Sequence, residues 1–425
     1  MIATAVVAFL VLVAISVPMA VAIGLAVALA LAVASPYPLA IMFQKMIAGT
    51  DNFVLVAIPL FILAGNLMNA GGITDRIFTF VRRCTGFVPG GLAYANVGSS
   101  LIFAGMQGSA VADAASLGKM EIKAMRDNGY STDVAAGITA ASSVVGPIVP
   151  PSIPLILYGA IAEVSIGRLF AAGIVPGLML ALALCAMIAL MDRRHHFPRD
   201  IRPTLADILR AFGSAFFALM TPVVILVGLL GGVFTPTEAA AVAVAYALIL
   251  SFGVYRTLRL RDLPGILVET MVTTAVVLFI IANVSALSWI LVVTQAASAL
   301  GEGIRALSDN PLVFLMLVNL LLLFLGSFIE DGAVLILMTP ILVPIATSLG
   351  IDPVHFGVVM VLNLMIGVAL PPVGMSLFVT AHVAGIPVER MFKAVMPFVW
   401  PMLITLLVVT YWPRLVLFVP SLLFP

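Results

Sequence analysis

The chain repeats one apolar unit twice, and both copies carry helix-breaking residues within membrane-like sequence. Leu-Phe-Ile-Leu-Ala at residues 60–64 returns as Leu-Phe-Ile-Ile-Ala at residues 278–282, an offset of 218. Two further strings repeat at offsets of 218 and 221: Gly108-Ser109 with Asp113 returns as Gly326-Ser327 with Asp331, and Gly146-x-x-x-Pro150-Pro151 returns as Gly367-x-x-x-Pro371-Pro372. A bilayer tolerates broken helices only where protein or a water-filled cavity surrounds the exposed backbone. The repeat therefore predicts two interrupted segments enclosed by the fold.

The composition is that of an all-α polytopic membrane protein. Of the 425 residues, 63% are hydrophobic and 9% are charged, whereas a soluble domain carries about 25% charged residues. The net charge of +1 does not indicate nucleic acid as a partner. Cys84 and Cys185 are too few for a disulfide framework. HExxH and P-loop strings are absent, so we expect no metal or nucleotide cofactor of those kinds.

Apolar segments and their interruptions divide the chain into four parts. A spanning helix needs about 20 apolar residues, and Gly- or Ser-interrupted stretches too long for one crossing are better explained as re-entrant hairpins. The four predicted parts are N-terminal scaffold helices at 1–52, a first repeat at 53–191, a basic loop plus scaffold helix pair at 192–262, and a second repeat at 263–425. The N-terminal part has a break at Ser16-Val17-Pro18, and the first repeat has a hairpin at about 85–128 and a broken helix at 134–162. The second repeat has a hairpin at about 311–350, a broken helix at 354–384 and a closing span at 395–419.

The basic residues predict the orientation of these parts. Arginine clusters at 192–210 and 255–262 flank an even number of crossings, so they share a side, which the positive-inside rule makes cytoplasmic. The loop at 294–310 has one Arg, whereas its counterpart at 72–84 has three, so we expect 294–310 to be periplasmic. Five crossings separate equivalent points, and an odd number inverts the second copy. We therefore predict inverted repeats, ten crossings, two hairpins and both termini outside the cytoplasm.

The two Pro-Pro breaks and the two Gly-Ser strings form the predicted site. Proline removes a backbone donor, and carbonyls freed at broken helices coordinate Na⁺ in transporters, while helix N-termini attract anionic groups. One lone break would favour a kink filled by Ser or Thr, but two equivalent breaks favour a binding site. The predicted substrate- and ion-binding residues are Gly108, Ser109, Asp113, Gly146, Pro150, Pro151 and Ser152 in the first copy, and Gly326, Ser327, Asp331, Gly367, Pro371, Pro372 and Gly374 in the second, with Na⁺ held by backbone near Ser109, Gly146, Ser327 and Gly367.

Acids inside apolar stretches are a third feature. Asp113, Glu330 and Asp331 are such acids, and an intramembrane acid indicates function because its burial costs several kcal/mol or more. Two interpretations of Asp113 and Asp331 stay open: they cap hairpin helices or bind loop amides, or they support an ion site. Repeated aspartates could also indicate an intramembrane aspartyl protease, but the Gly-x-Gly-Asp and Tyr-Asp strings of that chemistry are absent.

Several strings together resemble a known family, the large membrane subunit of tripartite ATP-independent periplasmic (TRAP) transporters. The resemblance covers nearly the whole chain. It implies a secondary transporter of the bacterial inner membrane with an elevator mechanism, and not an enzyme. The strings are Ile-Pro-Leu-Phe-Ile-Leu-Ala-Gly at 58–65, Gly-Ser-Ala-Val-Ala-Asp at 108–113, Gly129-Tyr130, Gly-Pro-Ile-Val-Pro-Pro-Ser-Ile at 146–153 and Phe-Thr-Pro-Thr-Glu-Ala-Ala at 234–240.

The resemblance also implies partners and a substrate class. The family works with a small four-helix membrane subunit and a periplasmic substrate-binding protein, and it imports organic acids such as C4-dicarboxylates or sialic acid with Na⁺ as coupling ion. We expect the small subunit to be a separate chain. The family often has Ser-Gly-Ser at the first hairpin tip, where this chain has Gln107-Gly108-Ser109. A self-sufficient Na⁺/dicarboxylate symporter of similar architecture is the alternative.

The expected mechanism divides the molecule into a moving and a fixed body. Hairpins and broken spans carry the interrupting polar strings, so we expect them to move together around the site. The spans at 212–254 and the N-terminal helices lack such strings, and we expect them to stay as scaffold.

Overall fold

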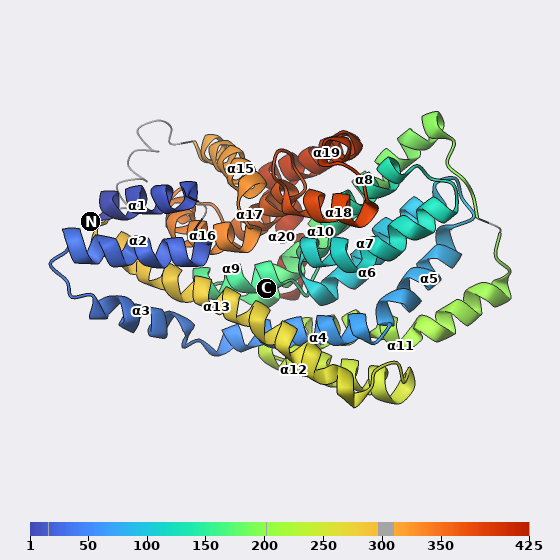
Figure 1. The fold of residues 1–425 in the computed structure, drawn as a ribbon, viewed down its shortest axis with the longest axis horizontal. Helices are drawn as coiled ribbons and strands as arrows, with labels where there is room; N and C mark the ends of the chain where they lie inside the picture. The colour runs from blue at the N-terminus through green and yellow to red at the C-terminus, as the bar shows by residue number, and fades with distance from the viewer. Residues whose placement is uncertain (16, 201, 296–309, 425) are drawn as a thin grey trace.

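The computed structural model is helical throughout the residues that it describes, which are 1–15, 17–200, 202–295 and 310–424 (Figure 1). Within these ranges, nine helices are long and apolar enough to cross a membrane. The prediction of a polytopic α-helical membrane protein is therefore confirmed. Most of the loop that we predict to be periplasmic, residues 296–309, lies outside the described residues.

The N-terminal helices form a small unit with its own apolar core. As predicted, the first apolar stretch is two helices, and Pro18 is the N-cap of the second. This unit packs on α13 (Leu263–Val293) of the second repeat, where Ala286 and Ile290 share a core with Val27 and Leu31. Its helices are α1 (Ile2–Ala14), α2 (Met19–Ala34) and α3 (Ala40–Thr50).

The first repeat contains an antiparallel helix pair followed by an interrupted helix. The pair, α6 and α7, turns at Gly108, whose φ of 62° is a left-handed conformation that suits glycine. The interruption separates α8 from α9. The elements are η1 (Phe53–Val56), α4 (Ala57–Ala70), α5 (Ile73–Thr85), α6 (Gly91–Gln107), α7 (Ala110–Asp127), α8 (Thr132–Ser143), η2 (Gly146–Ile148), α9 (Ile153–Ala162) and α10 (Ile166–His195).

Two helices between the repeats begin with capping boxes. Thr235 and Glu238 bond reciprocally at the start of α12, with the Thr235 amide donating to Glu238 Oε2 at 2.8 Å. Glu238, at the third position of the helix, therefore stabilises its N-terminus. Thr204 and Asp207 do the same for α11. The elements are α11 (Leu205–Leu230), α12 (Pro236–Leu248), its π-helical continuation η3 (Ile249–Val254) and η4 (Leu260–Asp262).

The second repeat follows the same order and interlocks with the first. Helix α18 packs on α7 and α8, α16 packs on α9, and α19 packs on α8. Every residue of α17 from Val354 to Val368 is buried, so this helix is central to the fold. After α13, the helices are α15 (Pro311–Phe328), α16 (Asp331–Ser348), α17 (Pro353–Val368), α18 (Met375–Ala384), α19 (Val388–Tyr411) and α20 (Pro413–Leu423).

The end of the chain departs from the expected single span at 395–419. Two helices, α19 and α20, occupy this stretch and are separated at Trp412. Pro413 takes the first position of α20, which is the position where a helix tolerates proline. The prediction of one continuous final helix is therefore wrong.

Candidate functional site

In the first repeat, the hairpin tip lies against the helix break. A Cβ added to Gly108 would lie 2.9 Å from the backbone nitrogen of Ile153, the first residue of α9. Hydroxyl groups cap both helices that begin here. Ser109 Oγ accepts the Ala112 amide at 3.3 Å, and Ser152 Oγ accepts the Leu155 amide at 3.2 Å. The N-terminal ends of α7 and α9 therefore meet, and neither is capped by an acid.

In the second repeat, the hairpin and the broken helix also meet, and no side chain lies between their backbones at the contact. A Cβ added to Gly367, near the end of α17, would lie 2.9 Å from the carbonyl carbon of Gly326, near the end of α15. Glycine at position 367 allows this approach, whereas a Cβ added to Gly326 would lie 3.3 Å or more from its neighbours. Gly374 is the N-cap of α18, and a Cβ there would lie 2.6 Å from the carbonyl oxygens of Val368 and Leu370.

The segment that carries each Pro-Pro string folds back on the helix before it. The hydroxyl of Ser152 donates to the carbonyl of Pro147 within the first break. The Gly374 amide donates to the Leu370 carbonyl at 3.1 Å in the second. The peptide bonds Pro150-Pro151 and Pro371-Pro372 are both cis. The two copies thus share a cis bond at the Pro-Pro string, whereas only the first has a 3-10 helix in its break.

A buried pair of serines joins the two breaks. Ser143 ends α8 and Ser376 lies in the first turn of α18, and their Oγ atoms are 3.0 Å apart. This pair links the two breaks, and the two glycine contacts link each hairpin to its own break. Sequence analysis missed both serines. A signal was present, because each lies within a few residues of its Pro-Pro string.

The repeated aspartates have different surroundings. Asp113 lies in the first turn of α7, where Ser109 is the N-cap, so the capping interpretation is wrong for Asp113. Its Oδ2 accepts the Ser100 hydroxyl at 3.1 Å, while its buried Oδ1 has no hydrogen-bond partner among the described residues. Asp331 begins α16, one residue after the N-cap Glu330. Like Asp113, Asp331 therefore lies in the first turn of its helix, where an acid is favoured.

An asparagine in each hairpin ties it to the broken helix, which sequence analysis also missed. In the first copy, Asn96 Nδ2 on α6 donates to Thr139 Oγ1 on α8 at 2.8 Å. In the second copy, Asn363 Nδ2 on α17 donates to Asn319 Oδ1 on α15 at 2.8 Å. All four side chains are buried. Each hairpin and its broken helix are therefore joined by side-chain hydrogen bonds inside the protein.

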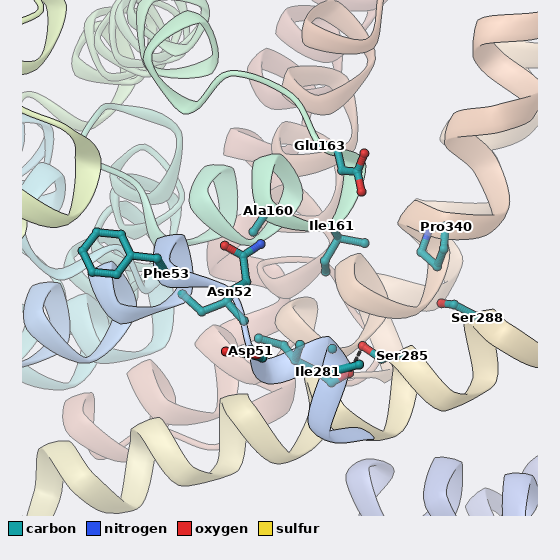
Figure 2. A pocket seen from close by; sticks show the side chains of 13 residues that line it. Asp51, Asn52, Phe53, Ala160, Ile161, Glu163, Ile281, Ser285, Ser288 and Pro340 are labelled. Atoms are coloured by element: carbon teal, nitrogen blue, oxygen red, sulfur yellow. Dashed lines mark hydrogen bonds between the residues drawn. The ribbon is translucent and has the colours of Figure 1, made fainter. Parts of the chain in front are cut away.

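A cavity of about 510 Å³ lies apart from these residues. Figure 2 shows its walls: Asp51 and Asn52 follow α3, Ser285 and Ser288 project from α13, Glu163 ends α9, and Pro340 lies on α16. None of the predicted site residues lines it. The cavity lies between α9 of the first repeat and α16 of the second repeat on one side, and α3 and α13 on the other side.

Comparisons with known proteins agree on the family. Residues 6–415 match the family described as tripartite ATP-independent periplasmic transporter, DctM component. The sialic acid TRAP transporter large permease protein SiaM of Vibrio cholerae is 47% identical over 379 residues, which cover 89% of each chain. The C4-dicarboxylate TRAP transporter large permease protein DctM of Pseudomonas aeruginosa is 38% identical over 90% or more of each chain. The chain spans 62% of the sialic acid permease protein SiaT of Haemophilus influenzae, at 44% identity.

Solved structures agree on the fold. The YdaH transporter of Alcanivorax borkumensis superposes with a TM-score of 0.63 at 15% identity over 88% of each chain. The relatives are transporter permeases and not enzymes, so the protease alternative is wrong. With nine potential membrane-spanning helices in the part of the chain that the structure describes, the chain is a multi-pass protein of the bacterial inner membrane. It belongs to the large permease subunits of TRAP transporters, which function with a small membrane subunit and a periplasmic binding protein.

Proposed function

We propose that this chain is the translocation subunit of a Na⁺-coupled importer that takes organic acids from a periplasmic binding protein. The observation that carries the proposal is the meeting of both hairpin tips with both helix breaks around Ser143 and Ser376. Broken helices paired across an internal repeat are where secondary transporters bind substrate and coupling ions.

The backbone at the breaks suits a hard cation such as Na⁺, which prefers oxygen ligands. Pro150 and Pro151 carry no N–H group, so they donate to none of the carbonyls that end α8. In the first copy, Na⁺ would be held by carbonyls near Ser109 and Gly146. In the second copy, the equivalent backbone lies near Ser327 and Gly367, where the tip and the break are in direct contact.

Helix ends favour an anionic substrate. The N-termini of α7 and α9 carry partial positive charge, and serine hydroxyls cap them, so no cap carboxylate repels an acid. Two of the relatives with high identity are named as sialic acid transporters and another as a C4-dicarboxylate transporter. We therefore propose a carboxylate-bearing substrate, with sialic acid as the first compound to test.

The proposed mechanism is an elevator movement of the hairpins and broken helices relative to α11, α12 and the N-terminal helices. The cavity of about 510 Å³ supports this division, because α3 and α13 form one wall and α9 and α16 form the opposite wall. We assign α13 to the fixed body in this proposal, although it belongs to the second repeat, because it packs on α2 and α3. A movement between two bodies requires a boundary that side chains do not fill completely. In this proposal the hairpins are re-entrant and the second repeat is inverted in the membrane.

Reconstitution tests the function directly. The chain would be placed in liposomes with its small membrane subunit, and uptake of labelled sialic acid and succinate would be measured with and without a Na⁺ gradient and the cognate binding protein. We expect uptake only when the gradient and all three proteins are present. Full uptake by the chain alone would instead establish the self-sufficient symporter.

A further inference from the structure

Glu121 is a buried acid that the proposed transport site does not use. It lies two turns beyond Asp113 on α7, and 1% of its surface is exposed. Helices α6, α8 and α18 pack on α7, together with η2. Asp113, Leu117 and Glu121 follow a four-residue spacing, which places them on one buried face of the helix.

The hydrogen bonds of Ser99 determine where a proton lies. Ser99 Oγ is 2.6 Å from Glu121 Oε1 and 2.9 Å from the carbonyl oxygen of Asn96. A hydroxyl has one proton to donate, while a carbonyl oxygen and an ionised carboxylate can only accept. If Glu121 were ionised, one of these two close oxygen pairs would contain no proton. If Glu121 is a neutral acid, it donates to Ser99 Oγ, Ser99 donates to Asn96, and both contacts are hydrogen bonds.

The charges around Glu121 also favour the neutral form. Among the described residues, no Lys, Arg or His side chain forms an ion pair with Glu121. Lys119 and Lys123 lie on the exposed side of α7. The titratable side chains of the packing helices are Tyr94 on α6, Asp133 on α8, which is paired with Arg390, and the exposed His382 on α18. The charge that acts on Glu121 is that of Asp113, which has the same sign. A buried carboxylate without a counter-ion is costly.

The second repeat has no acid at this position. The residue 218 positions later is Thr339 on α16, which is also buried. Its hydroxyl donates to the Leu335 carbonyl of its own helix at 2.6 Å, so it needs no partner on another helix. The second hairpin therefore packs without an acid at this position, and an acid here is a specific property of the first hairpin.

We propose that Glu121 is a proton-binding site in the first hairpin, occupied in this conformation, and that its proton holds α7 against α6 through Ser99. Loss of the proton leaves two like charges on the buried face of α7 and removes the hydrogen-bonded chain to Asn96. The stability that the neutral acid provides is present at low pH and is lost as the pH rises. Glu121 and Ser99, which hold the proton, are not among the residues proposed to bind Na⁺, although Asp113 lies next to both sites.

Infrared spectroscopy of the purified full-length chain detects the proton directly. At neutral pH, we expect the wild type to have a carbonyl band of a protonated carboxyl group that Glu121→Gln lacks and Asp113→Asn retains. Ser99→Ala removes the hydrogen-bond acceptor of this group, so the band should move to higher frequency. A Glu121→Gln spectrum with the full wild-type band would overturn the proposal. If Glu121→Gln does not fold, Ser99→Ala decides alone, because an unshifted band would also overturn it.

Thermal unfolding as a function of pH tests the consequence for the hairpin. The amide of Glu121→Gln can donate to Ser99 at every pH, so this variant should keep its melting temperature where the wild type loses stability, from the ordinary glutamate pKa of about 4.3 up to alkaline pH. Glu269→Gln, which changes an exposed glutamate on α13, is the matched control and should follow the wild type. Equal alkaline losses in wild type and Glu121→Gln would contradict a role for this proton.

Discussion

The hydroxyl of Ser376 donates a hydrogen bond to the hydroxyl of Ser143, across the boundary between the two copies of the repeat. The direction follows from proton count, because Ser143 donates its own proton to the Ala140 carbonyl at 2.9 Å. Both side chains are fully buried. Two helix breaks that lie far apart in the sequence are thereby held at a fixed distance of 3.0 Å between oxygen atoms.

Removing this bond should weaken the joint between the two breaks. Ser376→Ala deletes the donor, and we expect a loss of about 1 kcal/mol of unfolding free energy and reduced substrate uptake. Ser421→Ala removes a hydroxyl that bonds within exposed α20, so it serves as the control with little effect on either. The free energy of unfolding and the initial rate of uptake would be measured on the same preparations. If Ser376→Ala and Ser421→Ala had equal unfolding free energies and equal uptake rates, a joining role for Ser376 would be excluded.

The glycine contact of the second repeat should not tolerate a side chain. Gly367→Ala places a methyl group against the backbone of Gly326, so the tip must move away from the break. We expect Na⁺-dependent uptake to fall at least tenfold, which corresponds to about 1.4 kcal/mol. Gly265→Ala is the control, because its Cβ would meet open space on α13. Normal uptake by a correctly folded Gly367→Ala protein would contradict a functional contact at this position.

Removal of Na⁺ tests the ion sites. Replacing external Na⁺ by choline should abolish uptake, because the proposed carbonyl sites hold a hard cation. Asp113→Asn removes the charge beside the first tip and should raise the Na⁺ concentration needed for half-maximal uptake. The measurement is initial uptake against Na⁺ concentration at constant ionic strength. Unchanged transport without Na⁺, and without any effect of a proton gradient, would exclude both sites.

Cysteine labelling tests the orientation of the repeats. In a protein with Cys84 and Cys185 replaced, Asp309→Cys in the loop at 294–310 should react with an impermeant thiol reagent in intact cells. Arg202→Cys in the loop at 192–210 should react only after the membrane is opened. Reaction of Arg202→Cys in intact cells would contradict the inverted arrangement.

A cross-link through the cavity tests the elevator movement. Ile161→Cys and Ser288→Cys line the cavity of about 510 Å³ from opposite bodies, and joining them with a short thiol reagent should stop transport without preventing assembly with the small subunit. Ala48→Cys with Ser288→Cys lies within the scaffold on α3 and α13, and this control cross-link should leave transport intact. Full uptake after complete cross-linking of the first pair would rule out movement at this boundary.

Local chemistry made parts of the fold predictable. Pro18 breaks the first apolar stretch, as expected, because this effect depends on neighbouring residues only. The partners of Ser143 and Asn96 could not be predicted, because they depend on how helices pack. Glu121 was missed because Lys119 and Lys123 surround it in the sequence. The four-residue spacing from Asp113 nevertheless placed it on a buried face.

The packing of α18 on α7 and α8 has a consequence for biosynthesis. The first repeat is complete on the ribosome long before residues 375–384 are made, yet α18 covers part of its buried polar surface, including Ser143. Until then, Ser143 keeps its bond to the Ala140 carbonyl but lacks its partner Ser376, and the surface around it stays uncovered. A chain interrupted before α18 should therefore be retained by membrane quality control, because nothing within the nascent first half can close that surface.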